Sequence, residues 1–171
     1  QMMFETAPGF LFLRDESGPV RAILVKPVEF HQGDLVEVTG TPTKFADHSW
    51  LTFASAVRVG PKAMPPPKRL SGGKVGEHDA QYVTTKARVV DHSANVSNYT
   101  VAGKRIVLTL DALLVESEGV FFKVMFHQRV GALKRYPAGS VADFTGIVRG
   151  RGEFGENENY ETHLLVNEAA D

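Results

Sequence analysis

Apolar and polar residues alternate with a period of two through most of this chain, in short runs that begin and end at Gly or Pro. Such alternation is typical of β-strands that bury one face and expose the other. The strands that we expect lie at residues 9–14, 19–25, 34–39, 49–59, 80–90, 104–115, 119–127, 140–148 and 160–166. The pattern therefore predicts a chain that is almost entirely β.

An eight-residue run occurs twice in the chain. Residues 33–40 (GDLVEVTG) and residues 139–146 (GSVADFTG) both open with a turn glycine, continue with alternating apolar residues and close with Thr-Gly. An acidic residue, Glu37 or Asp143, lies at the same place in each copy. Internal repetition of this kind indicates that one supersecondary unit has been used twice. We therefore expect two related β modules in tandem.

The order of elements predicts the fold of each module. The spacing of Phe126, Val130 and Leu133 predicts a short helix, which Pro137 would end. Three strands, a helix and two strands are the order of an OB-fold, a five-stranded Greek-key barrel. In the first module only residues 1–4 precede a predicted turn at 5–9. We therefore expect an all-β protein with one short helix, made of two tandem OB-fold-like five-stranded Greek-key barrels, the first lacking most of its first strand.

Composition places the boundary between the modules. Three consecutive prolines at 65–67 favour an extended, stiff segment. We predict a first module at 1–60, a proline-rich linker at 61–75 and a second module at 76–171. Five basic residues between Arg58 and Lys74 are interpreted as the solvated charge of this linker. Residues 91–103 are polar and are predicted to form a loop.

The overall composition excludes several classes of chemistry. Of the 171 residues 43% are hydrophobic, which suits a globular domain, and no apolar run reaches the roughly 20 residues that cross a bilayer. The chain has no Cys, which removes disulfides, thiolate nucleophiles and Cys-based zinc sites. The formal net charge is -1, so total charge does not indicate a phosphate backbone as the partner.

Several runs of the chain resemble a known family. Residues 10–18 (FLFLRDESG) followed by 33–40 are similar to the tandem OB-fold-like extracytoplasmic, or periplasmic, sensory modules found upstream of bacterial histidine kinases and diguanylate cyclases. Residues 76–83 (GEHDAQYV) and 133–140 (LKRYPAGS) resemble the entry and the helix exit of the second module of such pairs. The resemblance implies a periplasmic location, tethered to the inner membrane through segments outside this chain, and no catalytic residues.

Motifs that would indicate an enzyme lack their structural context. Residues 150–155 (GRGEFG) match G-x-G-x-x-G, but a glutamate-rich run and a strand follow instead of the helix that would hold a phosphate. The six histidines include no pair at the i, i+4 spacing of a zinc protease. The two Asp-His-Ser runs are adjacent residues, whose side chains cannot form a triad with one another. We therefore predict no enzyme activity, no cofactor and no metal.

Aromatic and basic residues are the candidates for ligand binding. OB-folds bind through the face of their second and third strands, where aromatic rings stack on bases or sugars. Alternation allows only one of Phe121 and Phe122 to face the core. The predicted ligand-binding residues are Phe12, Trp50, Tyr99, Phe122, Arg149 and Arg151.

The resemblance and the missing catalytic motifs together favour one function. We expect the non-catalytic ligand- or partner-binding sensory region of a larger, membrane-anchored bacterial signalling protein, recognising a small molecule or a protein. The alternative is an OB-fold nucleic-acid-binding module, which the aromatic residues and Arg149 and Arg151 favour. The acidic residues between 153 and 161 argue against nucleic acid. Association into a dimer is a further alternative that the sequence leaves open.

Overall fold

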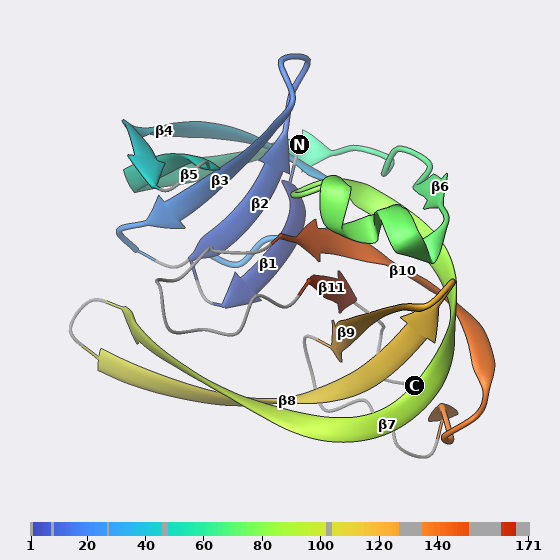
Figure 1. Ribbon diagram of the computed structural model, residues 1–171. Coiled ribbons are helices and arrows are strands. Elements are labelled where there is room, and N and C mark those ends of the chain that lie inside the picture. The colour runs from blue at the N-terminus through green and yellow to red at the C-terminus, as the bar shows by residue number, and fades with distance from the viewer. Residues whose placement is uncertain are drawn as a thin grey trace. The chain divides into compact units, whose positions relative to one another are not determined.

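The structure is a computed structural model, and it describes residues 2–7, 9–26, 28–45, 48–101, 104–126, 135–150 and 162–166. The described chain is built almost wholly from β-strands in two sheets (Figure 1). Among the described residues, those of the 3₁₀ helix η1 (Gly72–Glu77) and Arg135 are helical. The expectation of an all-β protein with little helix is confirmed.

The first sheet has five strands. They are β1 (Met2–Ala7), β2 (Phe10–Arg14), β3 (Pro19–Leu24), β4 (Asp34–Phe45) and β5 (His48–Pro61), in the spatial order β1-β2-β3-β5-β4. Neighbouring strands are antiparallel except β3 and β5, which are parallel. The two strands at the ends of this order, β1 and β4, approach each other.

The second sheet is a closed barrel with one added strand. Its strands are β6 (Lys68–Leu70), β7 (Tyr82–Val101), β8 (Lys104–Ser117), β9 (Val120–Phe126), β10 (Val141–Arg149) and β11 (His163–Val166). The order is β10-β11-β9-β8-β7-β6, and β10 also pairs with β7, which closes a five-stranded barrel. Strands β9 and β11 are parallel, as are β6 and β7.

The path of the chain is the same in the two sheets. Strands one to five lie in the order one-two-three-five-four, with three and five parallel, in β1–β5 and again in β7–β11. This order, together with closure between the first and fourth strands, is that of an OB-fold. The closed barrel of β7–β11 is therefore OB-fold-like.

The repeated eight-residue run occupies corresponding places. In each copy the first glycine, Gly33 or Gly139, has a positive φ, +94° and +88°, in the turn that leads into the fourth strand. In each copy the last glycine lies against the fifth strand. A Cβ on Gly40 would stand 2.9 Å from the Cβ of Ala54, and one on Gly146 would overlap the carbonyl oxygen of Leu165. Each copy of the repeat therefore forms the fourth strand of its sheet. Its first glycine is required by the positive φ of the turn, and its last glycine by the close approach of the fifth strand.

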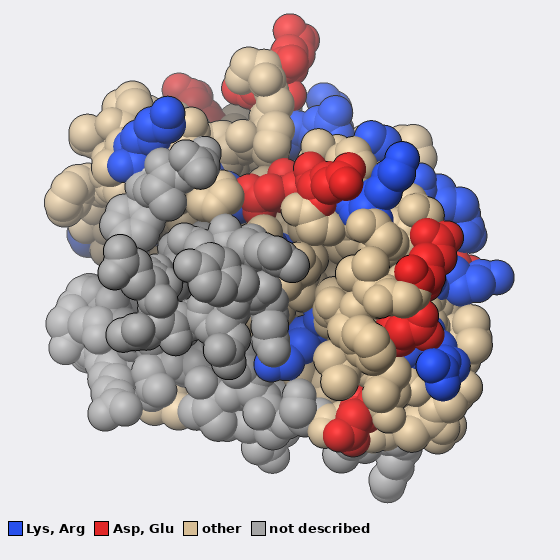
Figure 2. All heavy atoms as spheres, viewed as in Figure 1, with Lys and Arg blue, Asp and Glu red and all other residues tan. Residues whose placement is uncertain are grey.

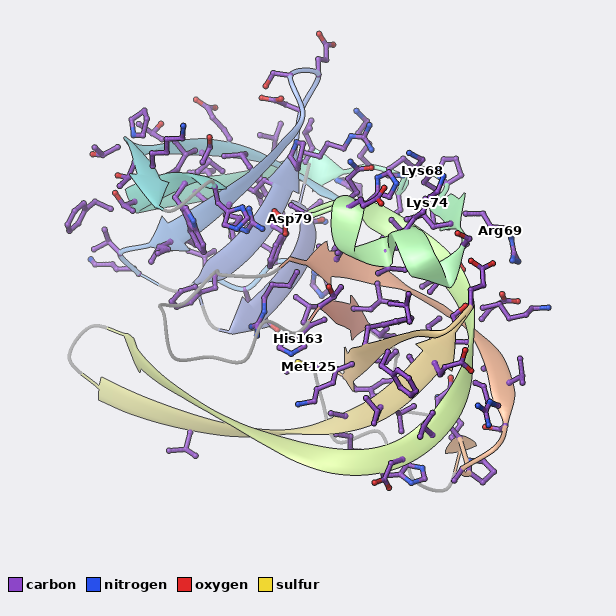
Figure 3. The ribbon with its side chains drawn as sticks, viewed as in Figure 1. Lys68, Arg69, Lys74, Asp79, Met125 and His163 are labelled. Carbon is purple, nitrogen blue, oxygen red and sulfur yellow. The ribbon has the colours of Figure 1, made fainter. Side chains whose placement is uncertain are left out.

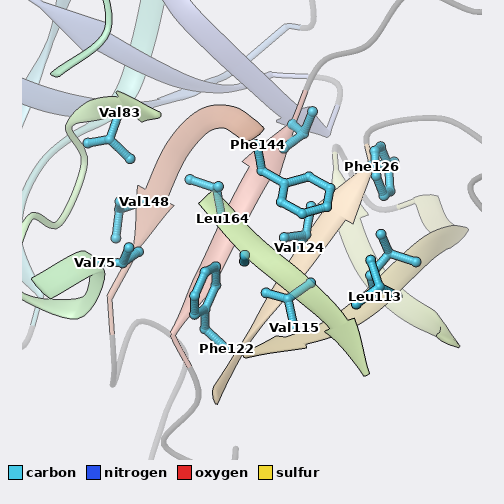
Figure 4. Packing of buried hydrophobic residues seen from close by; sticks show 13 residues of the cluster. Val75, Val83, Leu113, Val115, Phe122, Val124, Phe126, Phe144, Val148 and Leu164 are labelled. Carbon is cyan, nitrogen blue, oxygen red and sulfur yellow. The ribbon is translucent and has the colours of Figure 1, made fainter. Parts of the chain in front are cut away.

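Each sheet has its own hydrophobic core. In the barrel, inward-facing residues of every strand and Val75 of η1 pack together (Figure 4). Phe122, Phe144 and Leu164 in this cluster are at most 2% exposed. In the first sheet Leu11, Ala22 and Ala54 are at most 1% exposed. These cores hold the strands whose outer faces carry the sites described below.

One prediction about the first sheet was wrong. Its first strand is not missing, because residues 2–7 form β1 and pair with β2 over its whole length. The connection between the two strands is very short, and Gly9 adopts φ +86° within it. Residues 5–7 of the predicted turn therefore belong to β1, which has the length of an ordinary strand.

Predictions about three connecting segments also differ from the structure. The backbone of residues 91–101, predicted to be a loop, continues β7 to Val101. The segment 61–75, predicted to be a linker, contains β6 and the start of η1, and β6 pairs with β7. Phe126 ends strand β9, and the helix predicted between Phe126 and Pro137 otherwise lies outside the described residues, apart from the helical Arg135.

The chain divides into two compact units. One comprises residues 1–66 with 99–106, and the other comprises 67–98 with 107–171. The module boundaries drawn from composition, 1–60 and 76–171, stay predictions. None of the helices in the described part of the chain combines the length and the apolar character that a membrane span requires.

Candidate binding cleft

A cleft of about 450 Å³ lies in the second unit, lined by the core residues Val75 and Phe122 as well as by exposed residues such as Phe121. It lies between η1 on one side and the hairpin of β8 and β9 on the other, with the start of β11 beside it. The residues lining the cleft are Gly72, Gly73, Val75, Gly76, Glu77, Leu114, Val120, Phe121, Phe122, Lys123 and Thr162.

Glycines bring η1 close against the barrel. A Cβ on Gly72 would overlap the Cβ and Oγ of Ser117, and one on Gly76 would stand 2.9 Å from Oγ1 of Thr162. Val75 between them is 1% exposed and belongs to the barrel core. The 3₁₀ turn is therefore held by one apolar anchor and two close backbone contacts. Its glycines present backbone rather than side chains to the cleft.

Strand alternation sets the opposite wall. Phe122 and Val124 point into the barrel, whereas Phe121 and Lys123 point outward. Phe121 is 58% exposed although it is a large aromatic side chain. On the neighbouring strand β8, Leu114 pairs with Lys123, so an aliphatic side chain lies beside the ammonium-bearing one.

Hydrogen bonds fix the hairpin that carries this wall. Oε1 of Glu116 accepts from the backbone N–H of Gly119 at 2.8 Å, and Oε2 accepts from Nη2 of Arg88 at 3.2 Å. The Gly119 N–H, followed by the Arg88 guanidinium, lowers the pKa of the Glu116 carboxyl. Glu118 and Gly119 both adopt positive φ, +54° and +79°, in the tight turn. The β8–β9 turn is thus positioned by a charged acceptor.

The cleft brings together one group of each kind that a small amphipathic ligand could use. Phe121 offers an aromatic face, Lys123 a cation, Glu77 an anion and Thr162 a hydroxyl. The backbone N–H of Lys123 donates to the carbonyl of Thr162 at 3.0 Å, which joins the two strands at this point. Groups of these kinds can bind and orient a ligand by stacking, by charge and by hydrogen bonding.

On the face of the molecule that Figure 2 shows, acidic and basic side chains are interspersed. Two of the five basic residues between Arg58 and Lys74, which were predicted to be solvated, form ion pairs with acidic side chains. Arg58 Nε lies 2.8 Å from Oδ1 of Asp34, and Arg69 Nη1 lies 3.2 Å from Oδ1 of Asp143. Lys68 and Arg69 on β6 and Lys74 on η1 lie on the same side of the second unit (Figure 3). Within the residues described, no group of three His, Asp or Glu side chains could hold a metal ion.

Two of the predicted ligand residues, Phe12 and Trp50, are buried on the face of the first sheet opposite to its hydrophobic core, since they alternate with Leu11 and Leu51. Phe12 and Trp50 are 5% and 6% exposed. The guanidinium carbon of Arg21, itself 4% exposed, lies 5.2 Å from the ring centre of Phe12 and 5.7 Å from that of Trp50. This geometry is a buried cation–π cluster, in which both rings already have a partner.

The other predicted residues fall into three groups. Phe122 is 2% exposed in the barrel core, so of the adjacent pair it is Phe121 that faces outward. Arg149 is half-buried, and its Nη2 lies 2.7 Å from Nδ1 of His163 on the adjacent strand β11. The backbone of Tyr99 belongs to β7, but its side chain and the whole of Arg151 lie outside what the structure describes.

Sequence reasoning missed Phe121, Lys123 and the glycines of η1. Alternation indicated that one of the two adjacent phenylalanines faces outward. It did not indicate which one, because that depends on the register of the β8–β9 hairpin. The turn at Glu118–Gly119 sets Val120 opposite Ser117, and that register puts Phe122 inside. The spacing of Gly72, Gly73 and Gly76 was the available signal for a close backbone approach, and it lay in a segment predicted to be linker.

Comparisons with known proteins give the following results. No protein-family model matches the chain. No curated protein matches it either. Among solved structures, the chain is similar to a chain of a replication protein A heterotrimer bound to ssDNA, with 11% identity and a TM-score of 0.38. The match covers 93% of this chain and 43% of that one, so this chain spans less than half the length of that neighbour.

Proposed function

We propose that this chain is a non-catalytic binding region whose ligand occupies the cleft between η1 and the β8–β9 hairpin. The observation that carries the proposal is Phe121, an aromatic side chain that is 58% exposed inside a cleft of about 450 Å³. Ligand sites are typically concave, largely apolar and equipped with a few polar groups that fix orientation. Lys123, Glu77 and Thr162 would supply those polar groups.

The proposal includes a duplicated architecture. We infer that β1–β5 form a second OB-fold-like barrel, so that two such modules follow one another along the chain. The shared strand order and the matching glycines of residues 33–40 and 139–146 support this inference. In both sheets the hairpin between the second and third strands also turns at a positive-φ glycine, Gly18 or Gly119. A duplication would account for all three correspondences.

The wider role that we propose is that of an extracytoplasmic sensory region in a larger bacterial signalling protein. Its support is the resemblance of residues 10–18, 33–40, 76–83 and 133–140 to periplasmic modules of that kind. In this role the cleft would receive a small molecule or a segment of a partner protein. The full reading frame tests the role, because it should encode a membrane-spanning segment and an output domain. A frame that encodes neither would contradict it.

The cleft itself is tested with anilinonaphthalene sulfonate, a fluorescent aromatic probe. We expect saturable binding that Phe121→Ala weakens by about tenfold, because one aromatic stacking contact is worth about 1–3 kcal/mol. Val141→Ala is the matched control, since Val141 is 62% exposed on β10 and lies outside the cleft. Phe53→Asn is a second control, which removes an exposed aromatic side chain from the first unit. Equal affinities for Phe121→Ala and Val141→Ala, or a larger loss with Phe53→Asn, would contradict the proposal.

A nucleic-acid-binding module is the second candidate. Phe121 and Lys123 are successive outward positions on β9, the third strand of the barrel, where OB-folds place stacking and basic residues. Anisotropy of a labelled oligothymidylate at about 50 and 200 mM salt tests this candidate. Binding that weakens steeply with salt and is lost in Phe121→Ala and Lys123→Met would favour it. No binding at the lower salt concentration would eliminate it.

A further inference from the structure

Three nitrogen-bearing side chains form a row across neighbouring strands of the barrel. Lys123 on β9 pairs with His163 on β11, and His163 pairs with Arg149 on β10. At least one neighbour of each along its own strand lies in the barrel core, so the three side chains point outward. All three are half-buried. We call Lys123, His163 and Arg149 the donor row.

A hydrogen bond from Arg149 fixes the proton of His163. Nη2 of Arg149 lies 2.7 Å from Nδ1 of His163, and Nδ1 must be the acceptor because a guanidinium only donates. The imidazole in this contact is therefore neutral and carries its proton on Nε2, which is a donor. The same bond directs the guanidinium from β10 toward β11, the strand that neighbours Lys123. The donor row thus gathers a guanidinium, an imidazole N–H and an ammonium across three strands, which span about 10 Å.

The surface beside the donor row is shielded from water. Met125 and Leu165 follow Lys123 and His163 by two residues and point to the same side, and they are 2% and 4% exposed. His163 and Met125 are labelled in Figure 3. Charges interact more strongly at a partly desolvated surface than in bulk water. A negative group at the donor row would therefore be attracted by two full charges and would accept from the imidazole.

Two carboxylates limit the negative charge that this surface can accept. Oδ1 of Asp79 accepts from the backbone N–H of Gly150, the residue after Arg149, at 2.6 Å. Glu77 lines the same cleft as Lys123. An extended polyanion along the row would be repelled at both ends, whereas a single group in the middle would be repelled less. Guanidinium groups match the geometry of phosphate oxygens, which favours one phosphoryl group over a carboxylate.

We propose that Lys123, His163 and Arg149 form a binding site for one phosphoryl group. Lys123 also lines the cleft, and Phe121 is the adjacent outward position on β9, about 7 Å away along the strand. A small molecule with a phosphoryl group beside an aromatic or apolar body would reach both. This second part names the ligand class of the cleft and rests on the function proposed above, whereas the phosphoryl site itself does not.

Calorimetric titration of the full chain with inorganic phosphate at low salt tests the site alone. Wild type should bind saturably, and Lys123→Met and Arg149→Met should each weaken binding by about tenfold or more, because each removes a charged donor. Lys86→Met is the matched control, since it removes the same charge from an exposed position on β7 and should bind as wild type does. Circular dichroism establishes folding, and Lys123→Met provides the test if Arg149→Met does not fold. No binding by wild type, or an equal loss in Lys86→Met, overturns the proposal.

Nitrogen NMR of the imidazole tests the arrangement of the donors. At neutral pH His163 should carry its proton on Nε2, and added phosphate should shift the Nε2 resonance more than the Nδ1 resonance. A proton on Nδ1, or phosphate binding that leaves both resonances of His163 in place, would overturn the role given to this side chain.

Phenyl phosphate tests the connection to the cleft. Wild type should bind it more tightly than inorganic phosphate, and Phe121→Ala should remove that difference while leaving the affinity for inorganic phosphate unchanged. A difference that persists in Phe121→Ala upholds the phosphoryl site and overturns the aromatic phosphate as the ligand of the cleft. A labelled oligothymidylate that binds more tightly than phenyl phosphate, and is lost in Arg149→Met, would overturn the restriction to one phosphoryl group.

Discussion

At the scale of single residues, Arg21 packs against Phe12 and Trp50 on the face of the first sheet opposite to its hydrophobic core. Its guanidinium carbon lies within 6 Å of both ring centres, and all three side chains are at most 6% exposed. A desolvated cation–π contact is worth about 2 kcal/mol. The register Arg21↔Trp50 across β3 and β5 and Arg21↔Phe12 across β2 and β3 places the three side chains on one face. Their role in this geometry is to stabilise the sheet.

Replacing Trp50 tests that role. Trp50→Ala should lower the free energy of unfolding by about 3–5 kcal/mol, because it removes a large buried ring and leaves a cavity. Urea denaturation followed by far-UV circular dichroism measures the change. Val25→Ala is the matched control, since Val25 is 54% exposed, and it should change stability by at most about 0.5 kcal/mol. Unchanged stability in Trp50→Ala would contradict a structural role for the ring.

At the scale of elements, η1 determines whether the cleft exists. The 3₁₀ turn follows β6 directly and approaches the β8–β9 hairpin only because Gly72 has no side chain against Ser117. Gly73, by contrast, has room for a Cβ, which would stand 3.6 Å from Oε2 of Glu118 and 3.8 Å from Cγ2 of Val120, at ordinary van der Waals distances. A side chain would therefore clash with Ser117 at Gly72 but would fit at Gly73.

That difference predicts opposite outcomes for two alanine substitutions. Gly72→Ala should destabilise the protein by about 1–3 kcal/mol, the usual cost of overpacking, and should weaken probe binding in the cleft. Gly73→Ala should leave the stability nearly unchanged. The double variant Gly72→Ala with Ser117→Gly should recover most of the loss, because the overlapping side chain is gone. Equal effects of Gly72→Ala and Gly73→Ala, or no recovery in the double variant, would show that the close contact does not position η1.

Most of the strands could be predicted from the sequence, but two segments and the orientation of one side chain could not. Alternation and turn glycines predicted most strands, and the repeated run identified two fourth strands with matching environments. Two segments were misassigned because polar or proline-rich composition does not reveal pairing partners. Residues 91–101 continue a strand paired with β8, and residues 68–70 pair with β7. For the site, the outward position of Phe121 depended on hairpin register, which tertiary pairing fixes and composition does not.

At the scale of the whole molecule, hydrogen-bonded carboxyls set the response of stability to pH. Ser17 lowers the pKa of Asp15 chiefly through its side chain, whose Oγ donates at 2.6 Å. The backbone N–H of His31, at 2.9 Å, is the main cause that lowers the pKa of Asp34, and Arg58 adds to it. The Gly119 N–H does the same for Glu116. Burial acts in the other direction on Tyr82 and raises the pKa of its hydroxyl.

These shifts predict a stability plateau with a fall on each side. A carboxyl whose pKa is lowered by folding contributes full stability above its unfolded value, 3.8 for Asp and 4.5 for Glu, and loses it as the pH falls through the folded value. A hydroxyl whose pKa is raised by folding loses its contribution as the pH rises above 10.0. Thermal melts should therefore give a nearly constant Tm between about pH 5 and pH 9, and a lower Tm on either side.

The variant Asp34→Asn tests whether the carboxyl of Asp34 contributes to the fall in Tm at low pH. Its Tm should lie below that of wild type at neutral pH, since Arg58 loses its partner, and the difference should shrink as the pH falls below 3.8, where the carboxyl of the unfolded wild type takes up its proton. A constant Tm difference from pH 7 to pH 3 would mean that the charge of Asp34 does not contribute to stability.

The central claim is that the cleft beside η1 binds ligands, and amide chemical-shift mapping with anilinonaphthalene sulfonate tests it most directly. The account predicts the largest, saturable shifts at residues 72–77, 120–123 and 162, which line the cleft. Those shifts should be strongly reduced in Phe121→Ala and retained in Val141→Ala. Shifts confined to other regions of the chain, with residues 72–77 and 120–123 unperturbed, would contradict it.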